Sequence, residues 1–297
     1  MFDWQFFGLL ISNGVLIGLM YSLIALGFVL VYKATDAINF AQGEFVMIAG
    51  FMVAVALGAY GAPLWLAVAL ALALMIAFGF GLERAMLRPL IGRPIVAVIM
   101  ATIGLAAILR GFGPLMWGAE TKPLALPIPD EPIVWGPLFI PPIQLLGAAV
   151  SLLFLAIFGW FFLRSRQGIA MRAVADSQQV AMAMGVNVER YFALAWAMTG
   201  IVSALGGVVW GNLLGVDVHL ALVGFKVFPV VILGGLDSIP GAIIGGLIIG
   251  IVENVAAGYV DPWVGGGTKD FAPYVLMILA LMIRPYGIFG KQIIERV

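Results

Sequence analysis

Long apolar runs without charge, separated by short polar turns, fill most of this sequence. Leu9–Tyr32 contains 24 residues and no charged side chain. As a helix it would reach roughly 36 Å, more than the hydrocarbon core of a bilayer, which is about 30 Å thick. Cutting the sequence at charges and at Pro/Gly clusters predicts spans at residues 9–32, 45–60, 62–82, 95–117, 143–163, 191–213, 220–235, 240–257 and 271–284. The pattern therefore predicts an all-α polytopic membrane protein with about eight or nine transmembrane helices.

One predicted span, 220–235, is short for a full crossing. Pro229 interrupts it, and a strong turn signal at 234–241 (GGLDSIPG) separates it from the next apolar run. The freed backbone groups of a broken helix survive inside a membrane only where protein or water covers them. The two segments are either a re-entrant pair or two tilted spans, so some helices are expected to be broken or re-entrant.

The composition restricts the class of protein further. The chain is 63% apolar and 10% charged, against roughly 45–50% and 25% in soluble domains. Spans and turns use nearly all 297 residues, which predicts a single transmembrane domain, 1–297. A net charge of zero argues against nucleic acid as a partner. Without cysteine, with His219 as the one histidine and without a phosphate-binding G-x-x-x-x-G-K-[ST] motif, no metal or bound cofactor is expected.

Basic residues are distributed unevenly among the loops. They gather at 83–94, at 164–190 and in the C-terminal tail, whereas the Pro-rich loop 118–142 has Lys122 against three acidic residues. Because cytoplasmic loops carry an excess of Lys and Arg, the first three regions are predicted to be cytoplasmic. The Pro-rich loop and the N-terminus are then outside.

The first of three informative polar stretches is 33–44. Asn39 suits a helix N-cap, and Gln42 can reach back to it as in a capping box. A helix that begins there directs free N–H groups and the positive end of its dipole toward the preceding space. Transporters use such helix ends near the midplane to meet a substrate carboxylate. A plain cytoplasmic turn before a well-capped helix explains the same residues.

The second stretch, 164–190, reads as two short helices in a cytoplasmic segment. Asp176 or Ser177 caps the second helix, and Gly185 suits the left-handed position that ends it. Small and sulfur-containing side chains on a short surface helix form a knob that fits a partner's groove. A solvated connector is the alternative, but it has little need for apolar residues such as Met184 facing water.

The third stretch, 224–254, is rich in glycine and holds two intramembrane charges. Two small-x-x-x-small pairs occur in it, Gly241/Gly245 and Gly246/Gly250. This spacing lets helices touch backbone to backbone. Lys226 lies near the start of one apolar run and Glu253 near the end of the next, so their depths match if the two helices are antiparallel. An intramembrane charge is a functional candidate, but a structural Lys226–Glu253 ion pair is the favoured interpretation.

Few other ionisable residues lie in or beside the predicted spans. His219 is expected at the membrane interface, and Arg110 is expected to snorkel toward the outer surface. A stand-alone ion-coupled secondary transporter would rely on buried ionisable groups, and the candidates are Lys226, Glu253, Glu44 and Asp217. An intramembrane enzyme needs a catalytic cluster, which a chain with no cysteine, one histidine and no paired acidic motif does not offer.

Taken together, the three stretches resemble the permease subunits of bacterial branched-chain amino acid ABC importers, the smaller Liv-type member of the pair. The residues that carry the resemblance are GLMYSLIALG at 18–27, INFAQGE at 38–44, TIGL at 102–105, RAVADSQQVAMAMG at 172–185 and LGGLDSIPG at 233–241. They follow the family's order over nearly the whole chain. Gln42 stands where many relatives have histidine, and Arg110 stands where a neutral polar residue is common. Both departures bear on the substrate more than on the family.

The resemblance implies a function, a location and partners. The chain would be the permease subunit of an ATP-driven importer of branched-chain or related amino acids, with urea or short amides as the alternative substrates. It would lie in the bacterial inner membrane with its N-terminus outside and its C-terminus in the cytoplasm. Implied partners are a second homologous permease subunit, two cytoplasmic ATPase subunits that hold the ATP, a periplasmic solute-binding protein and membrane lipids.

The resemblance also implies roles for individual residues. The cytoplasmic segment would couple to the ATPase through Gly168, Arg172, Ala173, Asp176, Met184 and Gly185. The translocation path would be bordered by Asn39, Gln42, Gly43, Glu44, Gly234, Gly235 and Ser238. No residue is expected to be catalytic, because ATP hydrolysis would take place on other subunits.

Overall fold

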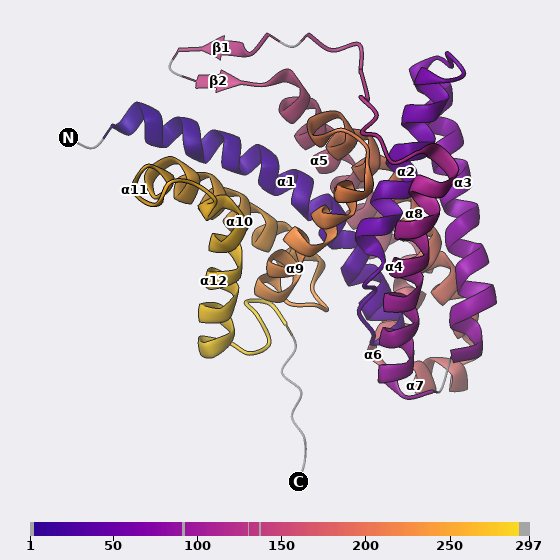
Figure 1. Cartoon of the computed structure of the whole chain (residues 1–297). Helices are drawn as coiled ribbons and strands as arrows, with labels where there is room; N and C mark the ends of the chain where they lie inside the picture. Colours follow the sequence, from indigo (N-terminus) through magenta and orange to yellow (C-terminus); the bar gives the residue numbers. More distant parts are fainter. Residues whose placement is uncertain (1–2, 91–92, 130, 137, 291–297) are drawn as a thin grey trace. The chain divides into compact units, whose positions relative to one another are not determined.

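The structure is a computed structural model that describes residues 3–90, 93–129, 131–136 and 138–290 (Figure 1). Its α-helices are α1 (Trp4–Thr35), α2 (Gln42–Gly58), α3 (Leu64–Leu82), α4 (Ile95–Trp117), α5 (Pro142–Arg164), α6 (Arg166–Asp176), α7 (Gln178–Ala183), α8 (Val188–Leu214), α9 (Leu222–Gly234), α10 (Ile239–Tyr259), α11 (Asp261–Val264) and α12 (Thr268–Ile283). The other elements are a π-helical turn η1 (Glu83–Leu87), the 3-10 turns η2 (Arg88–Leu90) and η3 (Val218–Ala221), and the strands β1 (Ile133–Trp135) and β2 (Leu138–Ile140).

The helices confirm the prediction of an all-α polytopic membrane protein. Six helical segments of the described residues are long and apolar enough to span a bilayer: Trp4–Thr35, Leu64–Leu90, Ile95–Trp117, Pro142–Arg164, Val188–Leu214 and Ile239–Tyr259. The helix α2 and the segment Val218–Gly234 are apolar but shorter. The first helix begins five residues earlier than predicted, because the uncharged residues 4–8 (WQFFG) continue it.

Two local features differ from the sequence-based expectation. Within the Pro-rich loop, β1 and β2 pair antiparallel with Ile133 opposite Ile140, a hairpin too short to stand out as alternating hydrophobicity. The helix α9 continues through Pro229 and does not break there, because a membrane helix tolerates the backbone bond that one proline removes. The break falls at the 235–238 turn, where α9 has ended and α10 has not begun.

The chain divides into two compact units, and neither is a continuous stretch of sequence. The terminal unit contains Met1–Val29, Pro127–Leu152 and Lys226–Val297, and the central unit contains Leu30–Leu126 and Leu153–Phe225. The helices α1, α5 and α9 each begin in one unit and end in the other. The single transmembrane domain expected for 1–297 stays a prediction.

In the terminal unit, α1 and α10 touch through backbone atoms. A methyl group added to Gly18 would lie 2.6 Å from the carbonyl oxygen of Gly246. Gly246 and Gly250 face α1, whereas Gly241 and Gly245 of the same helix face α9. The two small-x-x-x-small pairs seen in the sequence therefore serve two different neighbours of α10.

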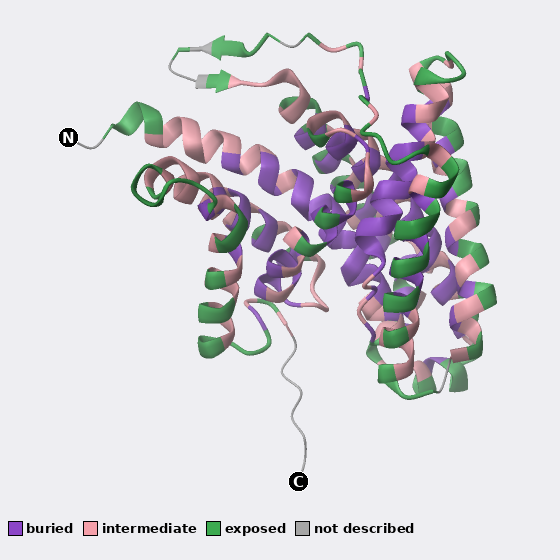
Figure 2. Cartoon of the chain, in the orientation of Figure 1, coloured by how far each residue is buried: buried purple, intermediate pink, exposed green. Residues whose placement is uncertain are grey.

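In the central unit, α2 and α3 pack along α8. Trp196 of α8 is fully buried, and its ring lies 6.0 Å from that of Phe45 on α2. Gly79 of α3 lies so close to the carbonyl of Trp196 that no side chain fits between the two helices. Figure 2 shows buried positions where helices adjoin and exposed positions on outward sides such as that of α3.

Gly18→Ala should destabilise the folded protein, because its methyl group has to displace the backbone of α10. Overpacking of this kind costs about 1–3 kcal/mol. Gly8→Ala on the same helix is the matched control: nothing lies within 4 Å of its added methyl group, and alanine favours a helix over glycine. Thermal unfolding of the purified protein in detergent measures both variants. A Gly18→Ala protein that melts at or above the wild-type temperature would contradict the close approach.

Candidate functional site

Polar side chains in and beside the turn before α2 are buried and bonded to one another. Asn39 and Gln42 are both 0% exposed. Asn39 Nδ2 donates to Gln42 Oε1 at 3.4 Å, and Gln42 Nε2 donates to Ser203 Oγ of α8 at 3.1 Å. Because a buried amide without partners is costly, this network fixes the turn against α8.

The start of α2 differs from the predicted capping box. The helix begins at Gln42, the residue before it is Ala41, and Asn39 is not its N-cap. Instead, Asn39 Oδ1 accepts a hydrogen bond from the backbone N–H of Ala41 at 3.1 Å. Asparagine forms such a turn as readily as a cap, so the sequence did not distinguish the two arrangements.

This turn lies beside the interior of two long helices and not beside their ends. The N–H of Phe40 donates to Thr102 Oγ1 at 3.3 Å. Thr102 lies about 10 Å along α4 from its first residue, and Ser203 lies about 22 Å along α8. The helix α2 therefore begins partway along its neighbours α4 and α8. Its free N-terminal N–H groups lie at that level, inside the unit.

Glu44, in the first turn of α2, is the charged member of this site. Its side chain is 2% exposed, and its Oε1 lies 2.5 Å from Nη2 of Arg110 on α4. The expectation that Arg110 snorkels toward the outer surface did not include this contact: the guanidinium lies against a buried carboxylate, which needs a counter-charge. Beside Glu44, Gly43 packs so closely on Gly224 that neither position has room for a side chain.

The cytoplasmic segment forms the two short helices that the sequence predicted, α6 and α7. Of the two candidate caps for α7, Ser177 is the one used: its Oγ accepts from the N–H of Val180 at 3.3 Å. Gly185 follows with φ 82°, the left-handed conformation expected of it. Local sequence signals therefore located both ends of α7.

The residues predicted to couple to an ATPase lie on two sides of this segment. Gly168 and Arg172 face their own chain. A methyl group at Gly168 would lie 2.6 Å from the Phe161 carbonyl oxygen, and the Arg172 guanidinium lies 5.7 Å from the ring centroid of Phe162. The exposed ones are Ala173, Asp176, Met184 and Gly185. Only the second group is placed where a partner can reach it.

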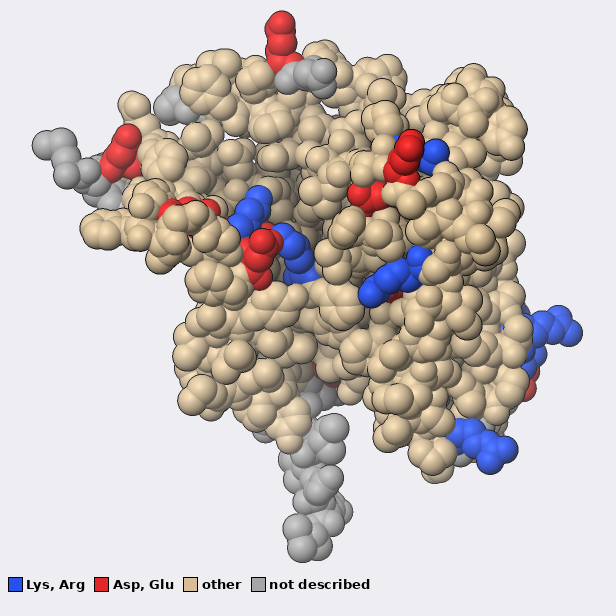
Figure 3. Space-filling view, in the orientation of Figure 1, with Lys and Arg blue, Asp and Glu red and all other residues tan. Residues whose placement is uncertain are grey.

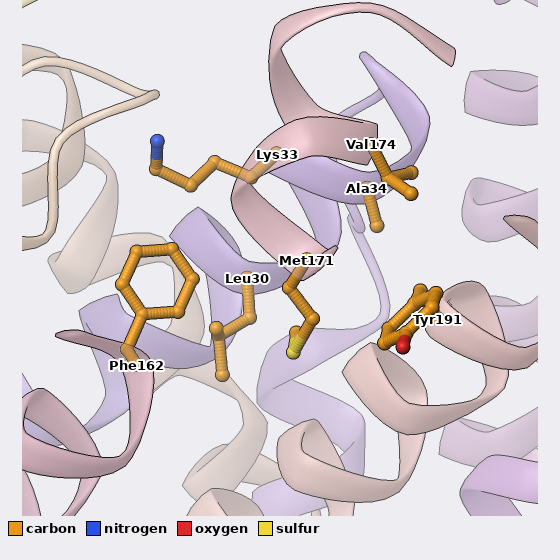
Figure 4. A pocket seen from close by; sticks show the side chains of 7 residues that line it. All are labelled: Leu30, Lys33, Ala34, Phe162, Met171, Val174 and Tyr191. Carbon is orange, nitrogen blue, oxygen red and sulfur yellow. The ribbon is translucent and has the colours of Figure 1, made fainter. Parts of the chain in front are cut away.

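The inner face of α6 is anchored on its own chain (Figure 4). Met171 and Val174 line a hollow with Leu30, Lys33, Ala34, Phe162 and Tyr191. The hollow has a volume of about 10 Å³, the space of about one water molecule, so it seats the helix and holds no ligand. By contrast, Val180, Met182 and Met184 are 62%, 55% and 79% exposed. These three side chains are called the α7 knob below.

A larger pocket of about 200 Å³ adjoins the end of α1. It is lined by Thr35, Asp36, Leu87, Leu90, Arg93, Ile95, Val98, Gln178 and Phe192. Burial raises the pKa of the Asp36 carboxyl above its ordinary value. Gln178 Nε2 donates to the carbonyl oxygen of Ala34 at 3.1 Å, which ties α7 directly to the end of α1 beside this pocket.

In the terminal unit, Gly234, Gly235 and Ser238 form the turn between α9 and α10. Gly235 has φ 105°, which favours glycine. Ser238 Oγ accepts from the N–H of Gly241 at 3.0 Å and caps α10. The residues predicted to border the translocation path therefore fall into two groups, 39–44 in the central unit and 234–238 in the terminal unit.

Lys226 contacts two carboxylates in the terminal unit. Its Nζ lies 3.6 Å from Glu253 Oε1 and 2.6 Å from Asp270 Oδ1. The buried Glu253 also accepts a hydrogen bond from the hydroxyl of Tyr21 at 3.2 Å. Sequence reasoning missed Asp270, because its separation of 44 residues from Lys226 has no helical or strand period that signals contact.

Charged side chains are sparse on the face that Figure 3 draws. Outside the spans, Asp217 accepts hydrogen bonds from the Thr121 hydroxyl at 2.7 Å and from the His219 backbone N–H at 2.8 Å. Burial favours a higher pKa for Asp217, but these hydrogen bonds outweigh it and hold that pKa below its ordinary value.

No three His, Asp or Glu side chains in the described part of the chain lie close enough to hold a metal.

Known proteins match this chain in fold and in sequence. PsaBC from Streptococcus pneumoniae, solved in complex with Fab, has the same fold with a TM-score of 0.51 at 13% identity, over 93% of this chain and 92% of that one. LivH of Escherichia coli (strain K12), a high-affinity branched-chain amino acid transport system permease protein, is 34% identical over 96% of both chains. BraD of Pseudomonas aeruginosa, with the same description, is 33% identical over 96% of both chains.

The family model described as branched-chain amino acid transport system / permease component matches residues 10–283. Together with the apolar spans, these matches define a multi-pass membrane transport subunit and not an enzyme. The chain belongs to the branched-chain amino acid transport system permease family.

Glu253→Gln should lower the amount of folded protein in the membrane and leave the choice of solute unchanged, because it weakens the buried acceptor shared by Lys226 and Tyr21. The expected loss is about 2 kcal/mol. Asp270→Asn is the matched control, since its side chain is 71% exposed and exposed ion pairs contribute about 0–1 kcal/mol. Quantitative immunoblots and thermal unfolding measure both variants. A Glu253→Gln protein at normal levels that has lost uptake would assign Glu253 to transport itself.

Proposed function

We propose that this chain is one of two permease subunits of an ATP-driven importer for branched-chain amino acids. The observation that carries the proposal is the 34% identity to LivH over 96% of both chains. A match that extends over the full length of both proteins supports a shared activity better than a match confined to one motif. The proposed partners are a second homologous permease, two cytoplasmic ATPases and a periplasmic solute-binding protein.

The proposed translocation path, called the passage below, is bordered by residues 39–44 and by residues 234–238. The first group is supported by its depth: α2 begins beside the interior of α4 and α8, so its N–H groups and helix dipole favour a substrate carboxylate there. The second group rests on the family resemblance of residues 233–241 (LGGLDSIPG), whose glycines pack directly on other backbone atoms. Because a binding protein makes the first selection of the solute, the passage itself needs no pocket of high affinity.

The α7 knob is the proposed docking element for an ATPase. Three exposed apolar side chains, two on a short helix and one directly after it, suit a groove on a partner. The same segment is anchored to its own unit through Met171 and Val174, and Gln178 bonds to the end of α1. Movement of α7 is therefore transmitted to α1. ATP-driven movement then tilts the spans between inward-open and outward-open states.

Val180→Asp combined with Met184→Asp should release the ATPase subunits, because a carboxylate placed in an apolar groove lacks a partner. Loss of such anchors costs about 2 kcal/mol or more, which is roughly thirtyfold in affinity. Gln179→Glu adds a charge to the same helix without removing an apolar anchor and is the matched control. Purification through a C-terminal tag in mild detergent measures the ATPase that accompanies each variant. A lone wild-type chain that transports in liposomes without ATP would instead support an ion-coupled secondary transporter.

The proposed orientation has the N-terminus outside and both α7 and the C-terminus in the cytoplasm, as the basic loops favour. Because the chain has no cysteine, single-cysteine variants report their side of the membrane without background. Glu120→Cys should react with a membrane-impermeant maleimide on intact spheroplasts, whereas Ala183→Cys should react only after permeabilisation. The reverse labelling pattern would overturn the orientation.

A further inference from the structure

Three carboxylates are buried among the described residues, and each lies beside a base. The pairs are Glu44–Arg110, Glu83–Arg88 and Glu253–Lys226. Glu83 and Arg88 join the turns η1 and η2 at the end of the Leu64–Leu90 segment, and Glu253 and Lys226 join α10 to α9. The pair of Glu44 and Arg110 differs because it lies beside a turn that is proposed to border the passage.

The Glu44–Arg110 pair lies deep within a span. Arg110 is about 22 Å along α4 from its first residue and about 10 Å from its last. Glu44 belongs to the first turn of α2, which begins at the depth of the neighbouring helices. Charges at such depth are costly and mark functional positions. Apolar contacts already join α2 to α4, with the ring of Phe51 stacked on that of Trp117 at 5.5 Å, so packing alone does not require an ion pair here.

The Arg110 guanidinium has donors available for a ligand. Its contact with Glu44 Oε1 is its one polar contact with the described residues, and a guanidinium carries five N–H donors. The Arg110 side chain is 43% exposed, whereas that of Glu44 is 2% exposed. Of the two side chains, that of Arg110 is therefore the accessible one, and the carboxylate lies behind it.

We propose that Arg110 and Glu44 form a zwitterion-exchange site, an inference that rests on the proposed function. Arg110 receives the α-carboxylate of an amino acid in its planar fork, and Glu44 receives the α-ammonium group. As the zwitterion enters, the ion pair opens and each charge exchanges one opposite partner for another, so no charge is left alone in the low-dielectric interior. A neutral solute offers no such exchange. The site therefore favours amino acids over urea and short amides.

The test uses proteoliposomes that hold the complete importer with its binding protein, and it counts leucine molecules imported per ATP hydrolysed. Arg110→Gln/Glu44→Gln removes both charges while keeping polar side chains, and the number of leucine molecules imported per ATP should fall roughly tenfold or more. Arg110→Lys keeps the positive charge but not the planar guanidinium with its paired N–H donors. It should import an intermediate number of leucine molecules per ATP. The matched control is Glu83→Gln/Arg88→Gln, a pair in the same unit with side chains 1% and 36% exposed, and its ratio should equal that of the wild type.

A wild-type ratio in the Arg110→Gln/Glu44→Gln importer would overturn the exchange site. So would single variants that lose folded protein while the double variant restores both the protein and the full ratio, since that pattern belongs to a purely structural pair. If the wild type imports leucine without ATP, the proposed ATP-driven function fails separately. The same variants then test the exchange site through the initial rate of uptake, and a double variant with the wild-type rate overturns it.

Discussion

Gly18 of α1 and Gly246 of α10 bring two helix backbones into direct contact, and Gly79 and Gly200 do the same for α3 and α8. The rest of each unit depends on such contacts. Lipid tails are as apolar as the helix surfaces, so in a membrane close packing has to supply the attraction that water supplies elsewhere. Because these contacts have no room for an added methyl group, they allow discrete arrangements of helices and resist gradual deformation, which suits a transport protein that alternates between states.

Close packing also decides where polar groups can remain. Asn39, Gln42 and Ser203 satisfy one another, and each buried carboxylate of the described residues lies beside a base. Polarity is therefore concentrated where a helix begins inside the unit, at the first turn of α2. The same local arrangement serves stability and the proposed function, because a buried network that holds a charge in place also presents it to a solute.

Features with a local cause were predictable from the sequence. Uncharged apolar runs located the long helices, and small residues at Ser177 and Gly185 located the ends of α7. Pro229 misled because a proline inside a membrane helix need not break it. Asn39 misled because an asparagine turn and an asparagine cap have the same sequence signal.

Contacts between distant residues left few signals in the sequence; the contact of Lys226 with Glu253, which their matched depths predicted, is an exception. Arg110 lies 66 residues from Glu44, and no period connects them. Asp270 was missed beside Lys226 for the same reason. The residues proposed for coupling and for the passage stay predictions, because their roles depend on partners and solutes that lie outside a single chain.

In the proposed function, ATP and not an ion gradient drives transport through this chain. The most direct measurement is leucine uptake by proteoliposomes that contain the assembled importer, its binding protein and internal ATP, with ionophores added to collapse every ion gradient. Uptake should continue at its full rate under these conditions and stop when ATP is omitted. Uptake that the ionophores abolish, and that an imposed ion gradient restores without ATP, would contradict it.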